Sequence, residues 1–218
     1  MVDPELDSQI ERADPDRWLA SRFIADASAR ADVIALYAFD HELGRVRLAT
    51  SNPLMGEIRL TWWREVLDEI FGSRTVRRHP TAQALAEVVT RHQLPRAPLE
   101  GMIDARYEEL GGRTPEGDEA LAWADAVGGG SMWLAALILD RETPALATGA
   151  AGRLFGLGRL GTPAAQLTAA RADARAAAKG LSVAAFPAVL PAALAGRSGE
   201  GPLRKRLRLT WAAATGRL

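Results

Sequence analysis

The hydrophobic positions of this chain recur at the three- and four-residue spacing of amphipathic helices along most of its length. One predicted helix begins at Asp14–Asp16, where an acidic side chain can cap the first turn and Pro15 fits its first position. A second runs from about Asp32 to Pro53, and a third from Pro53 to Gly72. Further helices are predicted over 80–92, 96–110, 117–127, 131–139, 145–160, 163–186 and 201–215, with glycines at 128–130 as one of the breaks.

Strand signals are weak, because no six-residue segment alternates between apolar and polar positions with turn residues at both ends. The sequence therefore predicts an all-α protein that folds as a single-domain helical bundle. Its predicted parts are a flexible acidic N-terminus over 1–13, a helical domain over 14–195 and a basic amphipathic C-terminal helix over 196–218. The alanine-rich stretch 164–195 should form helix easily, but its small side chains predict loose docking.

Composition excludes several classes of protein. The 218 residues are 48% hydrophobic and 25% charged, which is enough to bury a core, and the lack of cysteine excludes disulfides and thiolate zinc sites. Basic and acidic residues number 27 each, which argues against a nucleic-acid partner. The acidic N-terminus lacks the features of a signal peptide, and no apolar run has the length of a transmembrane helix. We therefore expect a cytoplasmic protein.

The charges are unevenly distributed along the chain. Residues 1–150 carry 16 basic and 25 acidic side chains, whereas residues 151–218 carry 11 basic and 2 acidic ones. In the C-terminal helix, one face gathers Leu203, Leu207, Thr210, Trp211 and Ala214. Two interpretations are open: the helix docks on the acidic bundle, or it attaches peripherally to an anionic membrane surface such as the inner membrane.

Several segments, taken together, resemble the squalene/phytoene synthase family. The most specific are LYAF at 36–39 with the residues up to Arg47, and IRLTWWR at 58–64. Shorter matching pieces are DRWLA at 16–20, HP at 79–80, LPRAPL at 94–99, IDAR at 103–106 and SMW at 131–133. The resemblance covers roughly residues 14–160 and implies the all-α isoprenoid-synthase fold, with a central cavity.

Active members of that family carry two aspartate-rich motifs on facing helices, and these carboxylates hold Mg²⁺ ions that bind two prenyl diphosphates. The resemblance places the first motif at Gly44, Arg45 and Leu48, and the second within 151–161. None of those three residues can bind Mg²⁺, and 151–161 contains no acid. The sequence therefore predicts no metal site and no cofactor, with Mg²⁺ expected only if the chain is an active transferase.

The helix matches better a divergent branch that reads approximately AFNxELxxVRD. That branch includes bacterial proteins and a mitochondrial assembly factor for respiratory complex I. Asp40, Glu42 and Arg47 fit this branch, whereas Leu48 replaces its further acid. The resemblance thus implies an isoprenoid or lipid ligand, and a respiratory complex or a membrane surface as partner.

Three hypotheses for function follow. The first is a pseudoenzyme that keeps the cavity and works as an assembly or lipid-binding factor. The second is an active isoprenoid-diphosphate transferase of terpenoid biosynthesis, in which arginines such as Arg45, Arg59 and Arg153 replace Mg²⁺. The third is a helical interaction module without a ligand. Whether the protein is an enzyme is thus open at this point.

Cavity and ligand candidates follow from the same match, and no catalytic residue is assigned. The candidates are Tyr37, Asp40, His41, Gly44, Arg45, Leu48 and Arg59. His41 stands alone, so we interpret it as a structural histidine rather than an acid or base. The carboxylate pairs Glu65/Glu69 and Asp104/Glu108 are better explained as surface ion pairs with Arg64 and Arg106 than as a replacement metal site.

Two further patterns have simple packing explanations. Gly156–Gly161 reads GLGRLG, which matches a dinucleotide-binding pattern, but the segment before it is helical rather than a strand. We therefore predict close helix packing there. In the IRLTWWR segment, the stripe formed with Leu60 and Leu67 predicts that Trp63 lies in the core and that Trp62 lies at its flank.

Overall fold

The computed structural model describes residues 4–49, 52–197 and 199–218, with the side chains of Pro4, Leu48 and Ala49 outside that description. Within these residues it contains eleven α-helices and no strand, which confirms the all-α prediction. The helices are α1 (Pro4–Ala13), α2 (Pro15–Ser21), α3 (Ala27–Ala49), α4 (Pro53–Phe71), α5 (Pro80–His92), α6 (Arg96–Tyr107), α7 (Gly117–Trp123), α8 (Gly130–Leu139), α9 (Ala145–Arg159), α10 (Thr168–Ala178) and α11 (Pro202–Thr215). Short 3₁₀ helices cover Leu110–Gly112 and Phe186–Leu194, and a π-helical turn covers Ala124–Gly129.

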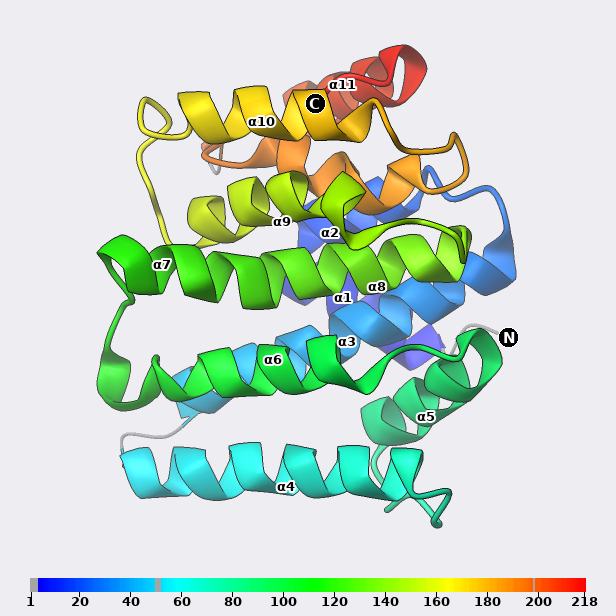
Figure 1. Ribbon diagram of the computed structural model, residues 1–218, viewed down its shortest axis with the longest axis vertical. Coiled ribbons are helices and arrows are strands. Elements are labelled where there is room, and N and C mark those ends of the chain that lie inside the picture. The colour runs from blue at the N-terminus through cyan, green and yellow to red at the C-terminus, as the bar shows by residue number, and fades with distance from the viewer. Residues whose placement is uncertain (1–3, 50–51, 198) are drawn as a thin grey trace.

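Helix α3 is the central element of the bundle. It runs behind a row in which α4, α6, the rod from α7 to α8, α9 and α10 lie one above another (Figure 1). It contacts α1, α2, α4, α5, α6 and α8. Its stretch from Val33 to Phe39 is at most 4% exposed, because apolar residues occupy every side of the helix there. A polar side chain in this part of α3 is therefore surrounded by protein.

Helices α7 and α8 form one continuous rod, although the glycines at 128–130 predicted a break. The π-helical turn Ala124–Gly129 joins them. Helix α9 presses its own glycines against this turn, so closely that a Cβ on Gly152 would lie 2.4 Å from the Cα of Gly129, and one on Gly156 would lie 2.6 Å from the Cα of Ala124. The glycines thus serve backbone contact between two helices, and the packing interpretation of GLGRLG is confirmed for Gly156.

Replacing Gly152 by alanine should lower the free energy of unfolding by about 1–3 kcal/mol, because the new methyl group forces α9 away from the π-helical turn. Gly149→Ala is the matched control: it lies on the same helix, and a Cβ there meets nothing within 4 Å. That variant should be neutral or slightly stabilising, since alanine favours helix over glycine. Urea unfolding of both variants tests the contact, and equal effects would contradict it.

The described part of the segment predicted to be flexible over 1–13 is helical, and residues 1–3 lie outside the described residues. Pro4–Ala13 form α1, whose Leu6 and Ile10 are buried against the bundle. These two apolar side chains stand one helical turn apart, so they share a face despite the acidic residues around them. Asp7 also connects α1 to α2, because its carboxylate accepts a hydrogen bond from the Trp18 indole at 3.0 Å.

The alanine-rich stretch also differs from its prediction. Helix α10 ends at Ala178 instead of near 186, and the following residues 186–194 form a 3₁₀ helix whose interior includes Pro191, which cannot donate an α-helical hydrogen bond. Ala188, Leu190 and Ala192 are completely buried. The small side chains let this segment approach its neighbours closely, so the prediction of loose docking is wrong for 186–194, whereas most of 164–183 is exposed.

One stretch in the described residues, Gly117–Leu139, is long and apolar enough by composition to cross a membrane, and 61% of its most apolar window is buried inside the protein. That burial is typical of a core helix, in line with its central place in Figure 1.

Candidate functional site

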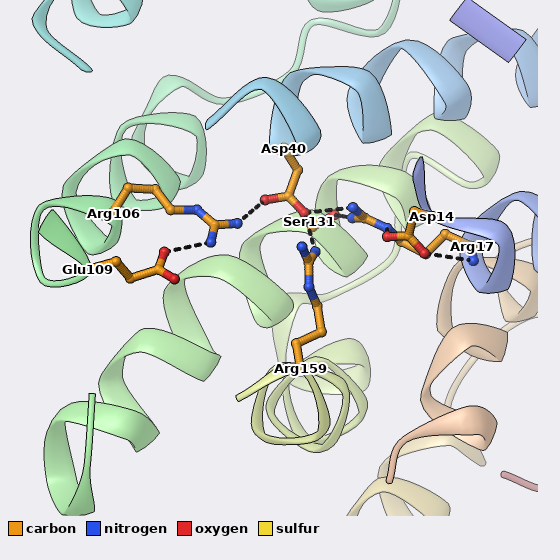
Figure 2. A network of polar contacts seen from close by, with 7 residues as sticks. All are labelled: Asp14, Arg17, Asp40, Arg106, Glu109, Ser131 and Arg159. Atoms are coloured by element: carbon orange, nitrogen blue, oxygen red, sulfur yellow. Dashed lines mark hydrogen bonds and ion pairs between the residues drawn. The ribbon is translucent and has the colours of Figure 1, made fainter. Parts of the chain in front are cut away.

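Asp40 of α3 is fully buried, and its carboxylate faces three arginines from three other helices (Figure 2). Arg106 of α6 donates to Oδ1 at 2.6 Å. Arg159 of α9 donates to Oδ2 at 2.8 Å, and a guanidinium nitrogen of Arg17 from α2 lies 2.8 Å from the same oxygen. One carboxylate therefore connects α2, α6 and α9 to the central helix.

Two further carboxylates complete the network. Asp14, the residue that caps α2, accepts from Nε of Arg17 at 2.6 Å, and Glu109 accepts from Arg106 at 2.7 Å. Ser131 adds a longer contact to Arg17, at 3.4 Å. We name these residues the Asp40 cluster: Asp14, Arg17, Asp40, Arg106, Glu109, Ser131 and Arg159. Its three carboxylates match its three guanidinium groups in charge, which is the condition for burying so many ions.

The arginines determine the ionisation of Asp40. Burial alone would raise the pKa of this carboxyl, but the positive charges of Arg17, Arg159 and Arg106 outweigh burial and hold that pKa well below its usual range. Asp40 is therefore a carboxylate at any pH near neutral. Its pairing with guanidinium groups leaves it neither a free base nor a free metal ligand.

Aromatic rings line the cluster. The Arg17 guanidinium carbon lies 4.5 Å from the ring centre of Tyr37, and that of Arg106 lies 5.0 Å from the ring of Trp123. Burial raises the pKa of the Tyr37 hydroxyl, so it stays neutral. These rings keep water from the ion pairs, which strengthens the pairing.

A pocket of about 300 Å³ adjoins the cluster. It is lined by Ala13, His41, Gly44, Arg45, Arg47, Arg106, Glu109, Thr114, Trp123, Arg159 and Leu160. Burial is the main cause that lowers the pKa of His41, so its imidazole is neutral at pH 7. Four arginines and one acid, Glu109, line the pocket, and Asp40 and Glu42 pair with three of these arginines, so the positive excess is small.

Two buried donors at this pocket lack an acceptor. Nε of Arg106 and Nε1 of Trp123 have no hydrogen-bond partner within the part of the chain that the structure describes, and both residues are less than 5% exposed. Buried donors without a partner are costly. Neither donor is exposed to the pocket, so a ligand with negatively charged oxygens would meet the more exposed Arg45 and Arg47 of the lining.

The residues predicted for the site are divided between the Asp40 cluster and the pocket beside it. Tyr37 and Asp40 lie at the cluster, and His41, Gly44 and Arg45 line the pocket. Gly44 lies beside Arg106, whose Cζ would be 3.8 Å from a Cβ there, an ordinary contact distance. The side chain of Leu48 lies outside the described residues.

Two of the three arginines predicted to bind diphosphate lie away from this pocket. Arg59 is exposed and lines a different groove beside Trp62 and His79. Arg153 pairs with Asp125 at 2.7 Å on the surface. Arg45 reaches the pocket while pairing with Glu42 at 3.0 Å.

The residues that sequence analysis missed are the buried arginines. Arg17 and Arg106 fell within matched segments, and Arg159 fell within the GLGRLG pattern, but none was assigned to Asp40. Arg106 was expected on the surface beside Asp104, and the structure buries it instead because Asp40 and Glu109 pair with it. The available signal was Asp40 itself, since an acid in an apolar helix requires buried cations.

The donor set does not fit Mg²⁺. Within the described residues, no group of three or more histidine, aspartate and glutamate side chains is placed to hold a metal. Asp40 and Glu109 are engaged by arginines, and the segment from α9 contributes the cation Arg159. Mg²⁺ would require oxygen ligands where these guanidinium groups stand. The surface acids Glu65 and Glu69 both bind Arg77.

Comparisons with known proteins identify the family and the fold. The sequence profile of squalene/phytoene synthase matches residues 10–160. NADH dehydrogenase (ubiquinone) complex I, assembly factor 6, from Bos taurus and from Homo sapiens, is in each case 29% identical over 101 residues, or 46% of this chain and 30% of the relative. The chain is therefore matched to less than a third of the length of these relatives.

Among solved structures, a dehydrosqualene synthase in complex with a ligand superimposes with a TM-score of 0.72. The alignment covers 96% of this chain and 94% of that chain, at 15% sequence identity. At this identity the likeness shows the fold alone, and it confirms the predicted isoprenoid-synthase fold.

Proposed function

This chain belongs to the squalene/phytoene synthase family, and from that premise we propose that it binds an isoprenoid or lipid phosphate without condensing it. The observation that carries the proposal is the Asp40 cluster. The resemblance places the family's first metal-binding motif at Gly44, Arg45 and Leu48, and one helical turn before Gly44 the carboxylate of Asp40 is held by arginines from α2, α6 and α9. The neighbouring pocket, lined by Arg45 and Arg47, supports binding of an anion without a metal.

The role that fits such a protein is that of an assembly factor. Its similarity to complex I assembly factor 6 over 101 residues supports a respiratory complex as partner. The working location we propose is the cytoplasm, at the surface of the inner membrane. A bound lipid would then serve to stabilise the fold or to orient the protein toward its partner.

Incubation of the purified protein with farnesyl diphosphate tests both halves of the proposal. Native mass spectrometry should show the diphosphate bound, while product analysis should show no squalene, phytoene or precursor above a no-protein control, with Mg²⁺ or with EDTA. The double variant Arg45→Gln/Arg47→Gln should lose binding at least tenfold, because it removes two cations from the pocket. Arg153→Gln is the control: it removes a surface arginine away from the pocket and should bind normally.

The other possible outcomes of the farnesyl diphosphate experiment each favour a different function. Heat-sensitive product that requires Mg²⁺ would restore the family's usual reaction. Product formed in EDTA would favour the second candidate, a transferase in which arginines bind the diphosphate. That candidate is supported by Arg159, which lines the pocket and whose pKa is lowered by burial; Asp40 counteracts this lowering, whereas Arg17 and Arg106 add to it. Absence of binding would leave a helical interaction module.

A further inference from the structure

Helix α11 docks on the bundle through one side only. Leu209 and Ala212 are buried in the same apolar cluster as residues 186–195. Lys205 donates to Asp16 of α2 at 2.7 Å, and Arg208 donates to Glu200 at 2.9 Å. On this inward side the apolar groups are therefore covered and the cations are paired.

The opposite side of α11 is apolar and uncovered. The exposed fractions are 70% for Leu203, 62% for Leu207 and 52% for Trp211. These residues belong to the apolar face that the sequence pattern predicted for this helix. They follow one another at intervals of four residues, so they form a line along a helix of 14 residues. The helix lies at the edge of the molecule (Figure 1), and no other described segment covers this line.

Unpaired cations stand on both flanks of the apolar line. Arg206 lies on one flank and Arg204 on the other, by the helical period. Both are exposed, and neither has an ion-pair partner among the described residues. Residues 201–218 contain no acid. The outward side is thus an apolar stripe with one unpaired arginine on each flank.

We propose that the outward side of α11, formed by Leu203, Leu207 and Trp211 with Arg204 and Arg206, lies in the surface of a bilayer that contains anionic lipid. Charge complementarity selects this occupant: the apolar stripe enters the acyl boundary, Trp211 lies at the headgroup level, and the two arginines reach lipid phosphates. Docking on the bundle and attachment to a membrane, the two interpretations of this helix from its sequence, are then both correct, because the helix docks by one side and meets the membrane by the other. The inference extends the membrane location in the proposed function but requires no ligand in the pocket.

Vesicle co-sedimentation of the full chain tests this surface. The protein should bind vesicles of equal phosphatidylglycerol and phosphatidylcholine and release from them as salt rises, and it should not bind phosphatidylcholine alone. The variant Leu203→Ser/Leu207→Ser/Trp211→Ser should lose at least tenfold in binding with an unchanged urea midpoint, since the three side chains are exposed. Arg204→Gln/Arg206→Gln should weaken binding and flatten its salt dependence.

Helix α4 provides the matched control. Leu54, Met55 and Ile58 are also exposed by about half, but the charges beside them, Glu57 and Arg59, are of mixed sign. Leu54→Ser/Met55→Ser/Ile58→Ser should bind vesicles like the unmodified chain. The proposal is overturned if the unmodified chain does not bind anionic vesicles, if the α11 and α4 triples lose binding equally, or if the α11 triple abolishes self-association without affecting vesicles. Because the readout is vesicle binding, failure here is distinguishable from failure of the farnesyl diphosphate experiment.

Discussion

Asp40→Asn should lower the free energy of unfolding by about 3–5 kcal/mol, the cost of removing one partner from a buried ion pair. The amide keeps the shape of the side chain but leaves Arg17 and Arg106, which are almost fully buried, short of one negative charge. Urea unfolding at pH 7 measures the loss. Asp104→Asn is the control, because Asp104 forms an exposed pair with Arg64 and should cost at most about 1 kcal/mol.

The penalty for Asp40→Asn should also depend on pH. The pKa of Asp40 in the folded protein lies below its value of about 3.9 in an unfolded chain. A carboxyl with a lowered folded pKa stabilises the fold above the unfolded pKa, and this contribution falls as pH decreases below that value. The difference between the unmodified chain and the variant should therefore be full at pH 7 and smaller at pH 3. A difference that is constant over this range would show that the charge of Asp40 is not what holds the cluster together.

The Asp40 cluster joins the central helix to three others by ion pairs. Here the carboxylate is on α3 and the cations come from α2, α6 and α9. The pocket beside the cluster is lined by Arg45 and Arg47, whose side chains are partly exposed. The proposed anion binding therefore rests on these two arginines rather than on a metal ion.

The helices were predictable because each apolar stripe is local, whereas the site was predictable only in part. Asp40 was a candidate through the family match alone, and its partners Arg106 and Arg159 are 66 and 119 residues away along the chain. No periodicity relates such positions. The π-helical turn escaped prediction for a similar reason: its glycines read as a break, and only the approach of Gly152 from α9 shows that they serve packing.

The adjacent residues Trp62 and Trp63 of helix α4 differ in burial. Trp63 is 4% exposed and packs edge-on against Phe39 of α3, with ring centres 5.3 Å apart, whereas Trp62 is only half-buried. The two rings themselves are 4.9 Å apart, so their difference lies in what else surrounds them. This confirms that the stripe through Leu60 and Leu67 marks the buried side of the helix.

Trp63→Ala should therefore lower the free energy of unfolding by about 3–5 kcal/mol, because it removes a buried indole and leaves a cavity against α3. Trp62→Ala should cost markedly less, since much of that side chain already contacts water. Urea unfolding of the two variants at one pH measures both losses. Small and equal losses would mean that α4 is held to the bundle by contacts other than Trp63.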